Sequence, residues 1–180
     1  MKEIKTFWQV VMGRKSVRNF KPGEIGKEEL LQIIKAGMAA PSAINLQPWE
    51  VVAVTERETL DKLGKAMPFA KMLYQASAAI IVCGKPKGNI LAKVVPVIGD
   101  YWVMDCSAMS ENMLLAAEAL GLGAVWTSVF PSISRAEEVR KILEIPDWVI
   151  PLNVIPIGIP ARTEKPKDKY REEKIHWEKW

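Results

Sequence analysis

Histidine and cysteine are scarce in this sequence. The 180 residues include one histidine, His176, in a charged C-terminal segment, and two cysteines, Cys83 and Cys106, far apart in apolar surroundings. A histidine-based catalytic triad or a zinc site therefore has almost no residues from which to be built. No metal-ligand spacing surrounds either cysteine, so we expect both to be reduced core residues of a cytoplasmic protein.

Long apolar runs and a dinucleotide fingerprint are also missing. Residues 1–11 lack the apolar core of a signal peptide, and no run is long enough to span a bilayer, so we expect no membrane association. No Gly-x-Gly-x-x-Gly follows a strand-like segment, which leaves a Rossmann site for a nicotinamide nucleotide unsupported. The net charge of +4 arises from 25 basic and 21 acidic residues that are well mixed, so a nucleic-acid partner is not required.

What the chain does contain is apolar residues in abundance. They make up 49% of the sequence, and tryptophan occurs seven times, which excludes disorder as a description of the whole. The length fits a single domain over residues 1–180 with its own core. Strand-like segments interspersed with helical ones, without repeats, favour an α+β or α/β layer fold.

Apolar periodicity and turn residues predict the element boundaries. We expect helices over 4–13, 27–40, 56–66, 68–74, 100–120 and 134–143, and strands over 50–55, 78–84, 124–130 and 149–159, the last interrupted by prolines. Residues 85–99 show no clear period and receive no assignment. Ser132 or Ser134 is expected to cap the helix before Leu143. The helix over 100–120 is apolar on several sides, which is typical of a helix at the centre of a fold or shared with a partner subunit.

A basic segment, Arg14-Lys15-Ser16-Val17-Arg18, follows the first expected helix. If it is extended, residues 14, 16 and 18 point to one face, because side chains alternate along such a backbone. Two guanidinium groups and a hydroxyl would then suit a phosphate monoester. The alternative is a solvated basic turn, which is what most short charge clusters are.

The loop from Pro41 to Trp49 connects an expected helix to an expected strand. Its prolines stiffen it, and Ser42, Asn45 and Gln47 offer neutral hydrogen-bonding groups. Such a loop suits a polar, planar ligand better than a metal or a phosphate. The alternative is a well-capped turn, since Pro, Ser and Asn favour turns for purely local reasons.

Four separated segments, taken together, resemble the nitroreductase family of flavin-dependent oxidoreductases. They are Arg14-x-Ser16-x-Arg18, Pro41-Ser42-Ala43-x-Asn45-x-Gln47-Pro48-Trp49, Gly121-Leu122-Gly123-Ala124-Val125-Trp126, and Ile157-Gly158-Ile159-Pro160 followed by Lys169-Tyr170. The resemblance extends in order from Arg14 to Trp180. It implies an α+β sandwich with a central, mainly antiparallel sheet flanked by helices, in an intertwined homodimer that holds two flavin mononucleotides (FMN) at its interface.

The resemblance also implies the residues that bind FMN. Arg14, Ser16 and Arg18, with Lys169, correspond to the phosphate site. Pro41, Ser42, Ala43, Asn45 and Gln47 would come from the other subunit and line the flavin. Backbone groups of Trp126, Thr127, Ser128, Val129 and Gly158 would approach the ring. The turn from Trp126 to Phe130 holds no acidic residue, where some larger relatives carry one, so the partner of the flavin N5 atom stays open.

The implied reaction has two steps in one pocket. NADH or NADPH gives hydride to the flavin and leaves, and a nitroaromatic, quinone or similar small-molecule acceptor then takes the electrons. The cofactor carries this chemistry, so no catalytic acid, base or nucleophile is expected from the protein. The alternatives are a flavin enzyme of the same fold with a dehalogenase-like or flavin-fragmenting reaction, and a non-catalytic flavin-binding module.

Overall fold

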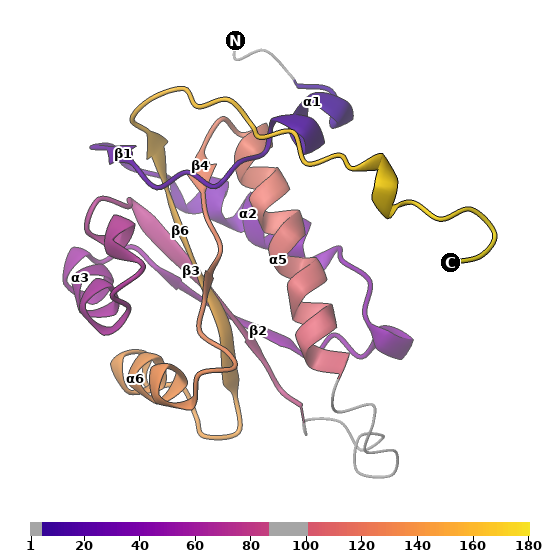
Figure 1. The fold of residues 1–180 in the computed structure, drawn as a ribbon. Coiled ribbons are helices and arrows are strands. Elements are labelled where there is room, and N and C mark those ends of the chain that lie inside the picture. Colours follow the sequence, from indigo (N-terminus) through magenta and orange to yellow (C-terminus); the bar gives the residue numbers. More distant parts are fainter. Residues whose placement is uncertain (1–4, 87–100) are drawn as a thin grey trace.

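A six-stranded antiparallel sheet forms the centre of the computed structural model, which describes residues 5–86 and 101–180 (Figure 1). Its strands are β1 (Phe20–Lys21), β2 (Trp49–Val54), β3 (Ala78–Gly84), β4 (Gly123–Ala124), β5 (Thr127–Ser128) and β6 (Ile150–Pro160). The long strand β6 pairs with β3 along one edge and with the short strands β1, β4 and β5 along the other. Strand β2 completes the sheet beyond β3.

Helices cover both faces of this sheet. The α-helices are α1 (Phe7–Gly13), α2 (Lys27–Met38), α3 (Arg57–Ala66), α5 (Trp102–Ala119) and α6 (Ile133–Leu143), and the short 3₁₀ helices are η1 (Ala43–Asn45), η2 (Lys71–Tyr74) and η4 (Glu172–Lys174). Side chains alternate along β3, so Ile80 packs with the α2–α5 layer while Ile81 packs with the α3–α6 layer. The predicted antiparallel sheet flanked by helices is therefore confirmed.

Helix α5 is buried on several sides, as its sequence predicts. It packs on α2 at Gly37, where an ideal Cβ would lie 2.7 Å from Met113, so only glycine permits this close approach. The helix ends before Gly121, whose φ of +74° glycine adopts without strain. In the described part of the chain, no helix is both long enough and apolar enough to cross a membrane.

The expected cap of α6 is right. Ser132 accepts a hydrogen bond from the Arg135 backbone N–H. On α3, the i,i+4 spacing of Glu58 and Lys62 predicts an ion pair, which forms at 2.7 Å. The hydrogen bond from Lys62, together with its positive charge, lowers the pKa of the Glu58 carboxyl group below its usual value. These outcomes follow from local rules that need no tertiary information.

Other expected boundaries are wrong. The helix predicted over 68–74 is the shorter η2, and the strand predicted over 124–130 is divided into β4 and β5, which keep one register on β6 across Val125 and Trp126. The strand β6 is continuous despite its prolines. Pro151 lies opposite a register shift in β3 between Val82 and Cys83, an irregularity of the kind that accommodates proline in a sheet.

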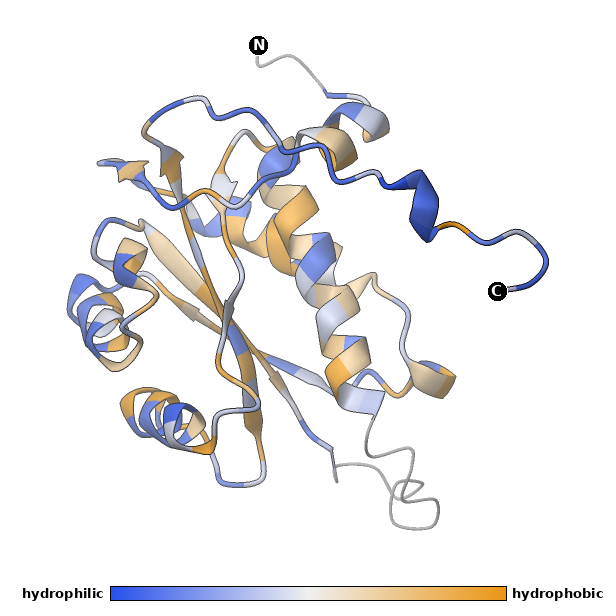
Figure 2. Cartoon of the chain, viewed as in Figure 1, coloured by the Kyte–Doolittle hydropathy of each residue, from blue (hydrophilic) through white to orange (hydrophobic). Residues whose placement is uncertain are grey.

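The C-terminal segment does not dock on the described part of its own chain. It runs past α1 and away from the body of the molecule (Figure 1), and it is mostly hydrophilic in Figure 2. Nevertheless, Trp177 is 82% exposed and Trp180 is fully exposed. Two tryptophans at the end of a charged segment predict that it docks. Such docking therefore requires another molecule, and it stays a prediction.

Gly84 offers a test of the packing between β3 and α5. An ideal Cβ on this residue would overlap the buried indole of Trp102, a rigid ring that cannot turn aside cheaply. We expect Gly84→Ala to lower the free energy of unfolding by about 1–3 kcal/mol, the usual cost of overpacking. Thermal denaturation measures this change, and Gly26→Ala is the control, because its Cβ would meet only Glu29 Oε2 at 3.6 Å. Equal stability of the two variants would contradict the packing argument.

Candidate functional site

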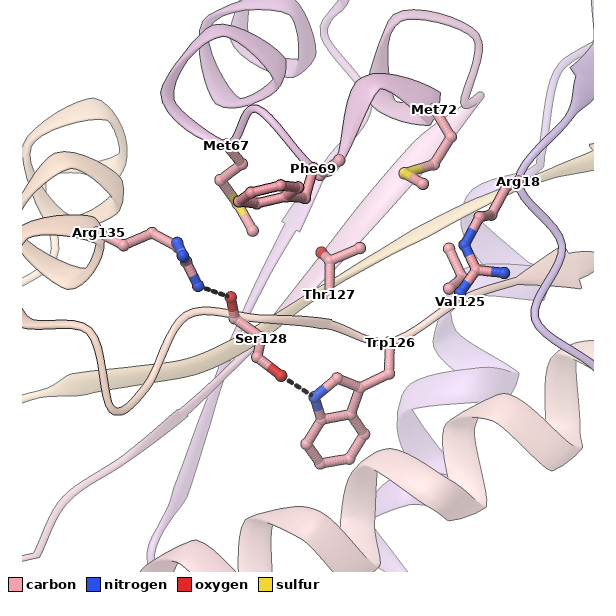
Figure 3. Close-up of a pocket in the computed structure, with 10 residues that line it drawn as sticks. Arg18, Met67, Phe69, Met72, Val125, Trp126, Thr127, Ser128 and Arg135 are labelled. Atoms are coloured by element: carbon pink, nitrogen blue, oxygen red, sulfur yellow. Dashed lines mark hydrogen bonds between the residues drawn. The ribbon is translucent and has the colours of Figure 1, made fainter.

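A hollow of about 300 Å³ lies between β5, α6 and the segment that joins α3 to η2 (Figure 3). It is lined by Arg18, Met67, Phe69, Ala70, Met72, Val125, Trp126, Thr127, Ser128 and Arg135. The segment from Val125 to Ser128, which ends in β5, forms one wall, and Met67, Phe69 and Met72 lie across from it. The structure thus brings together four residues predicted for the site: Arg18, Trp126, Thr127 and Ser128.

Hydrogen bonds hold the wall formed by residues 125–128 in place. Thr127 Oγ1 donates to the Val154 carbonyl on β6 at 2.6 Å, and the Trp126 indole N–H donates to Ser128 Oγ at 2.9 Å. Arg135 Nη1 donates to the Ser128 carbonyl at 2.8 Å (Figure 3). Ser128 is therefore fixed through both its side chain and its backbone, so the wall is preorganised for a ligand.

The segment from Arg14 to Arg18 brings one of its three predicted phosphate-site residues to the hollow. Arg18 lines the hollow, whereas Arg14 and Ser16 do not. Val17 is buried, and Ser16 forms a parallel bridge with Ala124. Arg14 lies in an ion pair, its Nε 3.4 Å from Glu111 Oε1. Arg18, in contrast, has no carboxylate partner in the described part of the chain.

A buried carboxylate anchors this basic segment to the fold. Glu118, on α5, is 8% exposed and accepts Lys5 Nζ at 2.6 Å and Lys15 Nζ at 3.3 Å. Lys15 also donates to the Gly13 carbonyl, so the chain is held on both sides of Arg14. The expectation of a free, solvated basic turn does not describe this segment.

The loop that follows Pro41 has an unusual backbone. Ile44, Asn45 and Gln47 have φ values of 45°, 59° and 50°, a left-handed region that non-glycine residues adopt at a cost. Ser42 Oγ accepts from the Gln47 backbone N–H, and Gln47 Nε2 donates to Asn45 Oδ1. Strain of this kind persists where the surroundings impose it, often at functional sites.

Asp105 holds the loop on α5. Its Oδ1 accepts from the Ala43 backbone N–H at 3.0 Å. Its other oxygen, Oδ2, is buried and has no hydrogen-bond partner among the described residues. The loop lies beyond α5 from β5 in Figure 1, so one chain does not bring Pro41, Ser42, Ala43, Asn45 or Gln47 to the hollow.

Besides Arg14, Ser16 and the loop residues, three further predicted residues lie outside the lining of the hollow. Gly158 is buried in β6, and an ideal Cβ there would lie 2.7 Å from Phe20, so packing alone accounts for this glycine. The Val129 side chain belongs to the core of the α3–α6 layer. Lys169 is exposed in the C-terminal segment. Their predicted contacts with a ligand stay predictions.

The cysteines are buried and free, as predicted. Burial raises the pKa of both Cys83 and Cys106 to about 12, so neither forms a thiolate near neutral pH. Cys106 Sγ instead lies 3.5 Å from the Cys83 carbonyl as a weak donor. These thiols do not supply a nucleophile.

Several residues that line the hollow were not predictable from the sequence. Met67, Phe69 and Met72 belong to a segment that looks like an ordinary apolar helix, and Arg135 is one of several charges on α6. Asp105 carries a usable signal, because it is a lone carboxylate in the apolar start of α5. A buried acid needs a specific partner, which here is the loop.

Comparisons with known proteins identify the family. The model of the nitroreductase family matches residues 11–70 and 68–159. The chain belongs to this family. An Archaeoglobus fulgidus relative named "Putative NADH dehydrogenase/NAD(P)H nitroreductase" is 42% identical over 175 residues, covering 96% of this chain and 97% of the relative.

Solved structures of nitroreductase relatives share the whole fold. A Parabacteroides distasonis protein of the same printed name has a TM-score of 0.87 at 46% identity, covering 96% of this chain and 98% of that one. An FMN-dependent nitroreductase from Clostridium difficile has a TM-score of 0.86 at 26% identity, covering 97% and 100%. The nitroreductase fold predicted from the sequence motifs is confirmed.

Proposed function

We propose that this nitroreductase is an FMN-dependent oxidoreductase that passes electrons from NADH or NADPH to nitroaromatic, quinone or similar acceptors. The names of the relatives support an NAD(P)H-dependent flavin oxidoreductase. The observation that carries the proposal here is the hollow that places the unpaired Arg18 beside the fixed wall from Trp126 to Ser128.

The chemistry of the hollow fits part of FMN. An arginine without a carboxylate partner suits an anionic ligand, because its fork of N–H donors matches phosphate and other planar acceptors. The wall combines an indole with hydroxyl and backbone groups, which suits a polar aromatic ring. A volume of about 300 Å³ is at the lower limit for a ligand pocket, so we infer that a second surface completes the site.

That second surface is the loop after Pro41 of another subunit. Within one chain this loop is strained, held by Asp105 and directed away from the hollow. Apolar side chains near it and at the N-terminus are exposed, including Phe7, Trp8, Ile44 and Met104. Exposed apolar patches of this kind mark interaction surfaces, which supports the homodimer.

The protein contributes binding and orientation. When bound, FMN supplies the electron transfer chemistry itself. Arg18 would balance negative charge on the cofactor, and the fixed segment from Val125 to Ser128 would hold its ring in one orientation. For a nitro group, uptake of two electrons and two protons yields a nitroso group and water, and NAD(P)H with one proton supplies both.

The visible absorption spectrum of the purified protein tests this proposal. We expect a flavin band that bleaches on anaerobic addition of NADH or NADPH and returns when a nitroaromatic or a quinone is added. A colourless protein that takes up no FMN would refute the proposal. A flavin band that NADH and NADPH leave unchanged would favour the alternatives of a different flavin reaction or of a non-catalytic flavin-binding module.

A further inference from the structure

Unpaired arginines gather at the hollow. The sequence contains seven arginines, of which Arg14, Arg57, Arg140 and Arg162 each lie within 3.4 Å of a carboxylate oxygen. In the described part of the chain, the arginines without a carboxylate partner are Arg18, Arg135 and Arg171. The first two line the same hollow, and no acidic residue of ranges 5–86 and 101–180 lines it. Arg18 and Arg135 thus place two positive charges in one small cavity without neighbouring carboxylates from those ranges. This arrangement indicates that each arginine binds an anionic group of a ligand.

Arg135 orients its guanidinium group toward the hollow, where it can bind such a ligand. It lies in the first turn of α6, and its hydrogen bond to the Ser128 carbonyl directs the guanidinium toward the hollow (Figure 3). That bond uses one of five N–H donors. The neighbouring acids Glu137 and Glu138 are exposed and form no ion pair with it. The remaining donors of Arg135 have no partner among the described residues, so they are available to an anion.

Phe69 adds an aromatic surface to the same side. Its side chain is 87% exposed, unusual for phenylalanine, yet its ring lies over the hollow beside Met67 (Figure 3). Aromatic rings gain about 0.5–1.5 kcal/mol from stacking on one another beyond simple burial. A flat aromatic ligand beneath Phe69 would therefore lie next to Arg135.

We propose that Arg135 and Phe69 form an acceptor subsite that selects aromatic electron acceptors bearing an anionic group such as a carboxylate. This inference rests on the proposed function. Arg18 serves the cofactor, and Arg135, on the other side of the hollow in Figure 3, binds the acceptor's anion while Phe69 covers its ring. The enzyme then prefers 4-nitrobenzoate to the neutral 4-nitrobenzyl alcohol.

The test compares these two acceptors in steady-state kinetics with the FMN-loaded enzyme. For Arg135→Gln we expect kcat/KM to fall about 10- to 100-fold for 4-nitrobenzoate, the effect of losing one charged hydrogen-bonded pair. For 4-nitrobenzyl alcohol we expect a change of about threefold or less. Arg135→Lys should give an intermediate loss, because lysine keeps the charge but not the planar fork.

Lys141→Gln is the matched control. It removes the same charge from the same helix at an exposed position outside the hollow, so the ratio of the two kcat/KM values should stay at its wild-type value. An equal fall for both acceptors in Arg135→Gln, together with loss of FMN, would mean that Arg135 binds the cofactor and would overturn the proposal. An unchanged ratio in Arg135→Gln would overturn it as well.

Calorimetric titration of the purified protein with 4-nitrobenzoate separates this inference from the proposed function. We expect binding that Arg135→Gln weakens at least about tenfold and Lys141→Gln leaves unchanged. If the protein carried no FMN, the proposed function would fail, while this titration would still decide the anion subsite. Equal affinity in the wild type and in Arg135→Gln would overturn the subsite even if the enzyme were active.

Discussion

Replacing Arg18 with alanine is expected to remove most of the bound FMN. Arg18 lines the hollow without any carboxylate partner in the described part of the chain, so its charge is available to a ligand. A charge-assisted hydrogen bond contributes about 1.5–3 kcal/mol, which corresponds to a roughly 10- to 100-fold weaker affinity when it is lost. The measurement is the dissociation constant for FMN, obtained by titrating the apoprotein and following flavin fluorescence.

The control for Arg18→Ala is Arg162→Ala. Arg162 is exposed and pairs with Glu164 at 2.9 Å, so its loss removes one positive charge without touching the hollow. FMN affinity should stay within about threefold of the wild-type value in this variant. A similar loss in both variants would mean that net charge, and not a contact with Arg18, governs binding. Unchanged affinity in Arg18→Ala would remove Arg18 from the site.

Arg14 should matter less than Arg18 in the same titration. The sequence pattern makes the two arginines equivalent, since both lie on one face of an extended segment. The structure distinguishes them, because Glu111 already balances part of the charge of Arg14. Ion pairs between distant segments of the chain are invisible to a local pattern, so this ranking required the fold.

The fold was more predictable from the sequence than the site was. Apolar periodicity located α2, α3, α5, β2 and β3, because burial of one face leaves a regular trace in the sequence. The same reasoning placed a helix over 68–74 and one strand over 124–130, where short elements take their form from neighbouring strands. Local propensity is weak evidence in such segments, since tertiary contacts override it.

The candidate site depended on contacts that no local pattern encodes. The motif containing Arg18 and the turn after Gly123 were both recognisable, and the structure joins them through the bridge between Ser16 and Ala124. Phe69 and Arg135 were not recognisable, because an apolar residue after a proline and an arginine on an amphipathic helix are ordinary features. Their importance arises only because the fold brings both side chains to the lining of one hollow.

The loop after Pro41 remains the part of the site that one chain leaves separate. Three non-glycine residues in left-handed conformations cost the folded state of order 1–3 kcal/mol each. Two hydrogen bonds within the loop and one from the Ala43 backbone N–H to Asp105 offset part of this cost. Such a loop is preorganised, which lowers the entropic penalty of binding a ligand. Since its own hollow lies beyond α5, the ligand we infer for it is the FMN of a partner subunit.

Mixed dimers test this sharing with a large expected effect. One parent carries Arg18→Ala and the other carries Ser42→Ala with Asn45→Ala, and each parent homodimer should hold little FMN. In the heterodimer one site combines both defects, while the other combines an intact Arg18 with an intact loop. Because a two-fold dimer has two equivalent sites, we expect about one FMN per heterodimer. Co-expression with two different affinity tags, tandem purification and flavin absorption give this stoichiometry.

The control is a heterodimer built from two differently tagged copies of the Arg18→Ala parent, in which both sites keep the defect and FMN should stay low. Recovery in the mixed pair alone would require that Arg18 and the loop from Ser42 to Asn45 meet across an interface, because no site within a single chain contains both intact parts. A mixed pair as empty as its parents would contradict the shared site. A monomer in light scattering at micromolar concentration would contradict it before any mixing, and the strained loop would then need another ligand.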